Sequence, residues 1–187
     1  MNDQMKALLP RIAMGLGVFI VGALVGWFVR GSGGDGAASI RVYDDWRVVC
    51  PADKTTKVSC QLTSELVDPK SGVLLARLAI GNEDGKETLA VRVPLTVLIP
   101  AGVGVQFGSE TQTFQYATCA AEGCLAFVPM DDKLRSSFDG AKSLSVLVTA
   151  SQNGKSVALP MSVKGFADAE KAYKNSEARR NSWWRKL

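Results

Sequence analysis

The sequence predicts an all-β domain, an antiparallel β-sandwich or barrel-like structure, that follows an N-terminal transmembrane helix. Roughly nine short alternating or apolar runs, separated by turn residues, are typical of such domains. Four cysteines fall in two close pairs, and an uncharged run occupies residues 12–29 ahead of them. This order places the cysteines beyond a membrane span, in an oxidising compartment where structural disulfides form.

The apolar run predicts a signal anchor over residues 12–30, after a cytoplasmic N-terminus of residues 1–11. A helix of this run is about 27 Å long, close to the roughly 30 Å of hydrocarbon in a bilayer. Signal-peptide cores are usually shorter, about 7 to 15 residues. The alternative is cleavage near Ala38, where small residues follow the run, which would release a secreted or periplasmic domain.

Residues 22–26 of the apolar run contain a GxxxG pattern that brings helices into close contact. Gly22 and Gly26 therefore suggest a homodimer through the membrane helix. The Gly- and Ser-rich residues 31–40 are expected to form a flexible linker. One domain is then expected over residues 41–175, followed by a tail of residues 176–187.

The first two strands are expected on either side of a polar turn. Trp46, Val48 and Cys50 alternate on one face of a run at residues 46–50, and residues 58–62 repeat the period of two. Further strand-like runs follow at residues 73–80, 88–93, 103–107, 113–119, 124–128, 144–150 and 156–161. Turn signals rich in Gly, Asn, Asp and Pro separate these runs, as in a domain built of hairpins.

A short crossover helix is expected to interrupt the strands. Asp131 and Asp132 suit a helix start, Leu134 and Phe138 share a face, and Gly140 ends the pattern. The strand pattern resumes after it, so this helix connects strands of one domain.

A second helix is expected to begin near Gly165. Phe166, Ala169 and Tyr173 share one face of it and are expected to pack against the edge or end of the sheet. The tail beyond it is either a solvated terminus or a membrane-surface contact, with Trp rings at the headgroups and cations on anionic lipid. The residues of that contact are Arg179, Arg180, Trp183, Trp184, Arg185 and Lys186.

The cysteines are expected to form two cross-strand disulfides, Cys50–Cys60 and Cys119–Cys124. Each pair flanks a turn, and directly opposed residues have Cα atoms about 4.5 Å apart in a non-hydrogen-bonded pair, within reach of a disulfide. The alternative is a thiol–disulfide catalyst at Cys119 and Cys124, although their spacing is not the CxxC of such enzymes. A four-thiolate zinc site needs another spacing, so neither a metal nor a cofactor is expected.

The chain contains no histidine, which excludes serine–histidine and cysteine–histidine hydrolases. The net charge of +4 is scattered, which argues against nucleic-acid binding. A carboxylate hydrolase remains an alternative, but the acid pairs lie in expected turns or helix starts, where acids are ordinarily solvated or capping. These pairs are Glu65 with Asp68, Glu83 with Asp84, and Asp131 with Asp132.

Five segments follow one another along the chain: residues 45–50 (DWRVVC), 60–62 (CQL), 93–95 with 100–103 (VPL and PAGV), 119–126 (CAAEGCLA) and 162–166 (SVKGF). In this order they resemble one known family, the invasion-associated locus B family. The similarity covers about residues 41–173. It implies an extracytoplasmic, mostly β, non-enzymatic domain of alphaproteobacteria. The apparent anchor and the basic tail depart from the ordinary exported member and favour an inner-membrane tether.

Each matched position has a structural interpretation and none is expected to be catalytic. Trp46 is expected to fill the core against a disulfide, and Phe166 to anchor the C-terminal helix in the sheet. Gly102 and Gly123 are expected at turns that need a permissive backbone.

We therefore expect a non-enzymatic binding or interaction domain, stapled by two disulfides and tethered by a single pass in the bacterial inner membrane with its C-terminal domain in the periplasm. The expected partner is another envelope protein or a wall or lipid component. Loops carry function on such scaffolds, and the turns at residues 82–86 and 108–112 are the first to consider. The alternatives are an enzyme that works without histidine and an envelope assembly or integrity factor.

Overall fold

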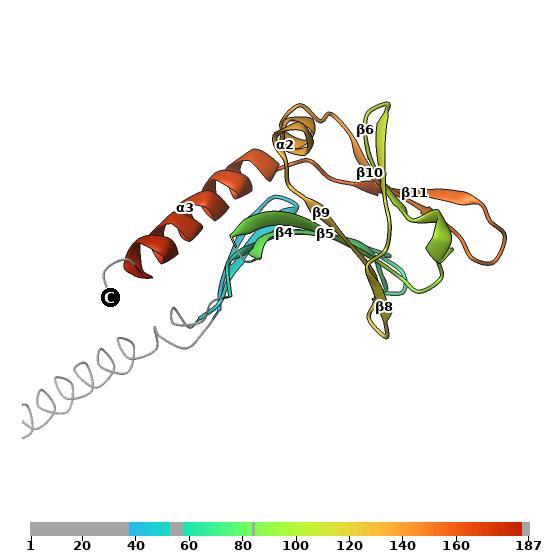
Figure 1. Cartoon of the computed structure of the whole chain (residues 1–187), viewed down its shortest axis with the longest axis horizontal. Helices are drawn as coiled ribbons and strands as arrows, with labels where there is room; N and C mark the ends of the chain where they lie inside the picture. Colours follow the sequence, from blue (N-terminus) through green and yellow to red (C-terminus); the bar gives the residue numbers. More distant parts are fainter. Residues whose placement is uncertain (1–37, 53–57, 84, 185–187) are drawn as a thin grey trace, which may run out of the picture. The chain divides into compact units, whose positions relative to one another are not determined.

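The computed structural model describes residues 38–52, 58–83 and 85–184, and these form two antiparallel sheets with two α-helices (Figure 1). The strands are β1 (Ser39–Tyr43), β2 (Trp46–Cys50), β3 (Gln61–Val67), β4 (Leu74–Glu83), β5 (Lys86–Val93), β6 (Val103–Phe107), β7 (Glu110–Phe114), β8 (Thr118–Ala120), β9 (Gly123–Pro129), β10 (Leu144–Thr149) and β11 (Ser156–Met161). The helices are the 3₁₀ turn η1 (Ile99–Ala101), α2 (Asp132–Asp139) and α3 (Phe166–Trp184). This mostly antiparallel β structure agrees with the all-β class that the sequence predicts.

The larger sheet has seven strands in the order β1-β2-β3-β4-β5-β9-β8, and the smaller has four in the order β11-β10-β6-β7. Hairpins account for most neighbours, as expected from the turn signals. The exception in the larger sheet is the β5–β9 pair, because the chain leaves after β5 to build β6 and β7 before it returns.

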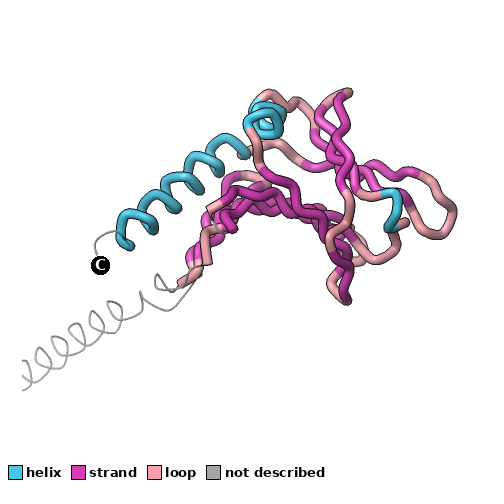
Figure 2. Tube along the Cα trace, in the orientation of Figure 1, coloured by secondary structure: helices cyan, strands magenta, loops and turns pink. Residues whose placement is uncertain are grey.

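Figure 2 shows the long strands of the larger sheet as an arch, with α2 and α3 on its convex side. The side chains that point toward the helices form the core. Along β2 and β5 every second residue is buried, the period expected for a strand with one face against a core. Trp46, Leu62, Leu78 and Val91 are fully buried members of that face.

Both predicted helices are present with the expected core residues. Asp131 caps α2 by accepting a hydrogen bond from the N–H of Leu134 at 2.7 Å, and Leu134 and Phe138 are buried. The Asp131 carboxylate replaces the missing intrahelical partner of that N–H. α3 is longer than expected: it continues to Trp184, so residues 176–184 of the predicted tail belong to the helix.

Two strand predictions need correction. Residues 39–43 form the edge strand β1, although the sequence predicts a linker up to residue 40. The predicted single strand over residues 113–119 is two strands, because the chain leaves the smaller sheet after Phe114 and enters the larger one at Thr118. A local pattern carries no information about which sheet each half joins.

The predicted anchor at residues 12–30, its Gly22 and Gly26, and Arg185 and Lys186 of the tail lie outside the described residues. Among the helices of the described part, none combines the length and the apolar character that a membrane crossing requires.

Candidate functional site

The four cysteines form two disulfides in the sequential pairing expected from the sequence. Cys50 is joined to Cys60 and Cys119 to Cys124, with Cα atoms 4.1 and 4.0 Å apart. Each bridge closes a hairpin of the larger sheet, β2–β3 and β8–β9. No cysteine is free in the described chain, so the pair considered for a thiol catalyst is held as a disulfide.

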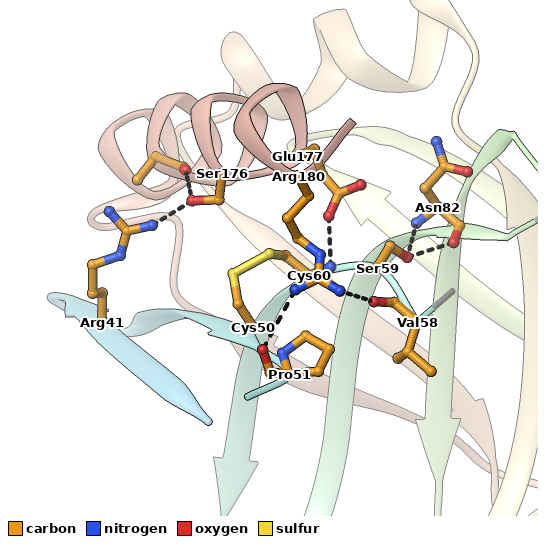
Figure 3. Close-up of a disulfide and its surroundings, with 11 residues drawn as sticks. Arg41, Cys50, Pro51, Val58, Ser59, Cys60, Asn82, Ser176, Glu177 and Arg180 are labelled. Atoms are coloured by element: carbon orange, nitrogen blue, oxygen red, sulfur yellow. Dashed lines mark hydrogen bonds between the residues drawn. A yellow bond between two sulfur atoms is a disulfide. The ribbon is translucent and has the colours of Figure 1, made fainter. Parts of the chain in front are cut away.

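The last turns of α3 bind the loop that the Cys50–Cys60 disulfide closes (Figure 3). The Glu177 carboxylate accepts a hydrogen bond from the backbone N–H of Cys60 at 2.6 Å. The Arg180 guanidinium donates to the carbonyls of Val58, at 3.0 Å, and Pro51, at 3.4 Å. Arg180, which the sequence suggests for a membrane contact, is therefore engaged within the domain.

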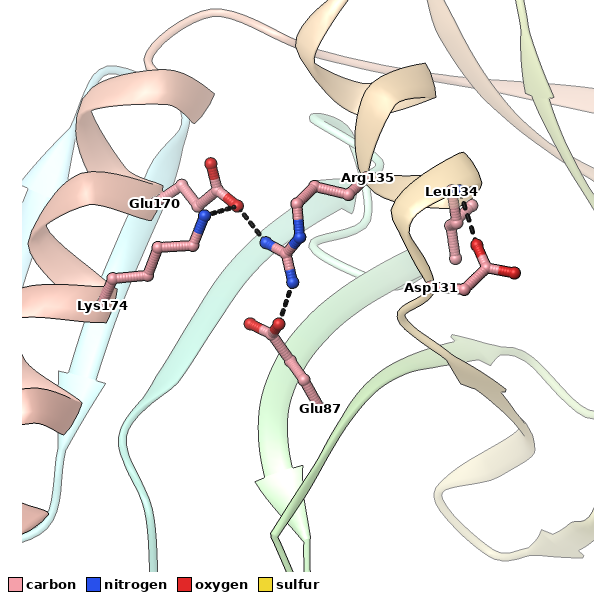
Figure 4. A network of polar contacts seen from close by, with 6 residues as sticks. All are labelled: Glu87, Asp131, Leu134, Arg135, Glu170 and Lys174. Carbon is pink, nitrogen blue, oxygen red and sulfur yellow. Dashed lines mark hydrogen bonds and ion pairs between the residues drawn. The ribbon is translucent and has the colours of Figure 1, made fainter.

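A charge network joins the two helices to β5 (Figure 4). The Arg135 guanidinium on α2 pairs with both Glu87 of β5 and Glu170 of α3, and Lys174 pairs with Glu170 at 2.8 Å. Burial alone would lower the pKa of Arg135, but the charges of Glu87 and Glu170 and their hydrogen bonds outweigh it and raise that pKa. The network is a structural clamp, since Arg135 and Lys174 together balance the charges of the two carboxylates.

An aromatic cluster fixes the start of α3. The ring of Phe166 lies 4.9 Å from that of Trp46, edge to face, and stacks on Phe138 at 4.9 Å. The Trp46 indole N–H donates to the carbonyl of Ser162 at 3.0 Å. Trp46 and Phe166 are thus core residues that join β2, α2 and α3.

Two glycines matched to the family motif lie where a side chain has no room. A Cβ at Gly102 would stand 2.4 Å from the carbonyl oxygen of Phe114, and one at Gly123 would stand 2.3 Å from that of Val93. Both also have positive φ, 69° and 122°, which L side chains rarely adopt. These positions require glycine for the backbone itself.

Three of the acids considered for catalysis serve an ion pair, a turn and a helix cap: Glu65, Asp68 and Asp131. Asp68 accepts hydrogen bonds from Ser71 and from the N–H of Lys70, and the Ser71 bond is the main cause of its lowered pKa. Asp131 caps α2, while Asp84 lies outside the described residues. In the described part of the chain no three Cys, Asp or Glu side chains are placed to hold a metal ion.

A polar recess of about 120 Å³ lies at the β1–β2 turn. It is lined by Asp44, Asp45, Arg47, Thr63, Ser64 and Glu65. Glu65 lies between two arginines, 3.7 Å from Arg47 and 3.5 Å from Arg77. Asp44 holds a positive φ of 49° and pairs with Lys164 at 3.0 Å. The recess is small and opens beside a much larger surface.

That larger surface is the outer face of the seven-stranded sheet, the face turned away from the core and the helices. Residues directly opposed across antiparallel strands lie on one face, so the pairing places three parallel rows on it. The uncharged row is Ile40, Val49, Gln61, Gly81, Thr88 and Pro129. The central row is Val42, Arg47, Thr63, Ala79, Ala90 and Phe127. The arginine row is Glu65, Arg77, Arg92 and Leu125.

The outer face carries apolar side chains in the open. Phe127 is 47% exposed, and Ile40 and Val42 on the edge strand are 61% and 62% exposed. Val49 and Leu125 are half-buried. This face is the concave side of the arch, and in Figure 1 no labelled helix or strand covers it. The sequence alone does not reveal this surface, because outward-facing residues of β5 such as Ala90 and of β9 such as Phe127 come together only when the strands pair.

The two predicted loops belong to different sheets. Residues 82–86 include the turn between β4 and β5, in the larger sheet, whereas residues 108–112 include the turn between β6 and β7, in the smaller one. Glu110 in the second turn pairs with Lys133 of α2 at 3.2 Å.

The sequence and the fold of this chain are similar to those of known proteins. The family model described as "Invasion associated locus B (IalB) protein" matches residues 46–174. The chain belongs to the invasion associated locus B family. The invasion protein B homologue of Brucella abortus (strain 2308) is 27% identical over 142 residues, covering 72% of this chain and 79% of the relative. The homologue of Brucella abortus biovar 1 (strain 9-941) gives the same values.

A solved structure shares the IalB fold. The crystal structure of invasion associated protein b from Bartonella henselae superposes with a TM-score of 0.63 at 20% identity, over 73% of this chain and 96% of that one. The family resemblance of the sequence is therefore confirmed. The matched region contains both disulfides and all strands of the outer face except β1.

Proposed function

We propose that this IalB-family chain is a membrane-tethered, extracytoplasmic binding domain that acts through a partner in the bacterial envelope and has no catalytic role of its own. The observation that carries the proposal is the outer face of the seven-stranded sheet. An antiparallel sheet with one solvated face ordinarily alternates apolar and polar residues. Here the solvated face itself bears Val49, Leu125 and Phe127, and exposed apolar surface of this kind marks interaction sites.

The disulfides support the extracytoplasmic location. Such bridges persist in oxidising compartments and are rare in the cytosol. The loop closed by Cys50 and Cys60 also holds α3 through Glu177, so an oxidised state is part of the folded arrangement. The tether is proposed from the apolar run at residues 12–30, with the domain in the periplasm.

Two measurements in intact cells test the proposal. A C-terminal alkaline phosphatase fusion, which is active only outside the cytoplasm, is expected to be active, and the matching green fluorescent protein fusion exported by the same route is expected to be dark. Photoreactive residues placed singly at Thr88 on the outer face, at Ser109 in the β6–β7 turn and at Lys171 on the exposed side of α3 are expected to capture an envelope component from at least one position. A cytosolic reporter signal, or no adduct from any position, would contradict the proposal.

A further inference from the structure

We propose that the outer face docks an acidic amphipathic helix of another envelope protein, lying across the strands along the central row with its carboxylates on the arginine row. The inference rests on the proposed binding function and names its surface and the chemistry of the partner.

The centre of the outer face has space for a helix because its side chains are short. Ala79 and Ala90 oppose each other in the central row, and Gly81 and Thr88 oppose each other in the uncharged row. Phe127 ends the central row on β9. Short side chains between larger ones let another backbone approach closely, as small residues do where helices pack.

The charge on the outer face is net positive at β4 and β5, whereas Asp44, Asp45 and Glu65 line the recess beside Arg47. Arg47, Arg77 and Arg92 carry three positive charges, and Glu65 is the acid among them. Glu65 lies between Arg47 and Arg77, whereas Arg92 forms no ion pair with any residue that the structure describes. Arg77 and Arg92 are directly opposed across β4 and β5, which is unfavourable for like charges. An acidic partner would relieve this repulsion.

The uncharged row lies on the other side of the central row from the arginine row. A helix along the central row would therefore have arginines on one flank and Val49, Thr88 and Pro129 on the other. Its matching sequence has an apolar stripe with Asp or Glu along one edge, the pattern of helices that bind in grooves. Guanidinium groups bind carboxylates through paired hydrogen bonds.

The curvature of the sheet favours a protein partner over a membrane surface. The outer face of the sheet is the concave side of the arch (Figure 2). A flat bilayer would therefore meet the ends of the strands before it reached the central row. A helix is about 10–12 Å in diameter, and when it lies across the strands on the concave side it can contact the central row along its length. Six strands at about 4.8 Å spacing span roughly 24 Å, the length of about 16 helical residues.

The test uses the full-length chain in its own cells, with a photoreactive residue at Thr88. We expect adducts with an acidic amphipathic segment, identified by mass spectrometry of the crosslinked peptides. Arg92→Glu is expected to reduce adduct yield about tenfold. Lys155→Glu, which makes the same charge change in the β10–β11 turn, is expected to leave it unchanged. Ala90→Gln, which fills the central row without changing charge, is expected to reduce it as well.

A charge exchange completes the test. If Arg92→Glu acts by repelling carboxylates, replacing an acid of the captured segment with Lys restores the adduct. Thermal melting of each variant verifies that it is folded. Adducts that contain lipid only, a captured segment without acids, or a yield unaffected by Arg92→Glu would each overturn the inference.

The failure of this inference is distinguishable from failure of the proposed function. Capture from Ser109 or Lys171 without capture from Thr88 would retain a binding domain and reject the outer face as its surface. Loss of capture from all three positions would reject both.

Discussion

The carboxylate of Glu177, near the end of α3, accepts a hydrogen bond from the backbone N–H of Cys60, one half of the first disulfide. The two residues are 117 positions apart in the chain. The bond satisfies an N–H beside the start of β3 and ties the C-terminal helix to a covalently closed loop. We therefore expect helix docking and disulfide formation to be linked in this IalB-family domain.

Replacing Glu177 with Ala is expected to lower the free energy of unfolding by about 1–2 kcal/mol, because a part-buried N–H loses a charged acceptor. Glu177→Gln retains an acceptor oxygen and is expected to cost less. Amide hydrogen exchange measures the effect: the last turns of α3 should exchange faster in Glu177→Ala. Unchanged exchange in α3 would show that the bond does not hold the helix.

Removal of either disulfide is expected to destabilise the domain, but only removal of Cys50–Cys60 is expected to loosen α3. Replacing both cysteines of either pair with Ser should lower the free energy of unfolding by about 2–3 kcal/mol, since each bridge closes a short loop. Loss of Cys50–Cys60 should also expose α3 to proteolysis, whereas loss of Cys119–Cys124 should not. Equal cleavage of α3 in the two variants would contradict the link between helix and loop.

Arg135→Met is expected to be among the more damaging substitutions of charged residues. It leaves Glu87 and Glu170 facing each other without their shared cation, at a cost of about 2–4 kcal/mol by urea denaturation. Lys174→Met, at a side chain that is half exposed, is the matched control and should cost under about 1 kcal/mol. Adding Glu87→Gln and Glu170→Gln to Arg135→Met should recover part of the loss, and no recovery would argue against charge as the cause.

Gly123→Ala is expected to destabilise the domain by more than about 2 kcal/mol, because the new Cβ collides with the backbone of Val93. Gly154→Ala is the control: its φ is also positive, 68°, but nothing lies within 4 Å of the added Cβ. It should cost only about 1 kcal/mol of backbone strain. Thermal unfolding of the two variants measures the difference, and equal losses would assign the effect to φ alone.

The stability of the domain is expected to fall as pH rises from 10 to 12. Burial raises the pKa of Tyr116 from 10.0 to about 12, and burial likewise raises the pKa of Tyr173. A raised pKa in the folded state means that the protonated phenol is favoured there, so this stabilisation is complete below pH 10 and is lost through the folded-state pKa. Urea denaturation between pH 9 and 12 measures the slope, which Tyr116→Phe should reduce. An unchanged slope in that variant would exclude Tyr116 as its source.

The local sequence determined the elements of this protein and the residues that face its core. Alternation at residues 46–50 places Trp46, Val48 and Cys50 inward because successive side chains of a strand point to opposite faces. Asp131 and Gly140 delimit α2 because capping acts within one turn of helix. The close spacing of the cysteines likewise predicts their pairing, since each bridge lies across a single hairpin.

Only the tertiary structure decided how those elements combine. The outer face exists because β5 pairs with β9 across an excursion through the smaller sheet, which brings Ala90 beside Phe127. Arg77 and Arg92 become neighbours only through the β4–β5 register, and Glu177 meets Cys60 only when α3 folds back over β2 and β3. Periodicity reports which side of its own strand a residue occupies, whereas contacts between distant segments depend on strand order, register and packing, which no local pattern encodes.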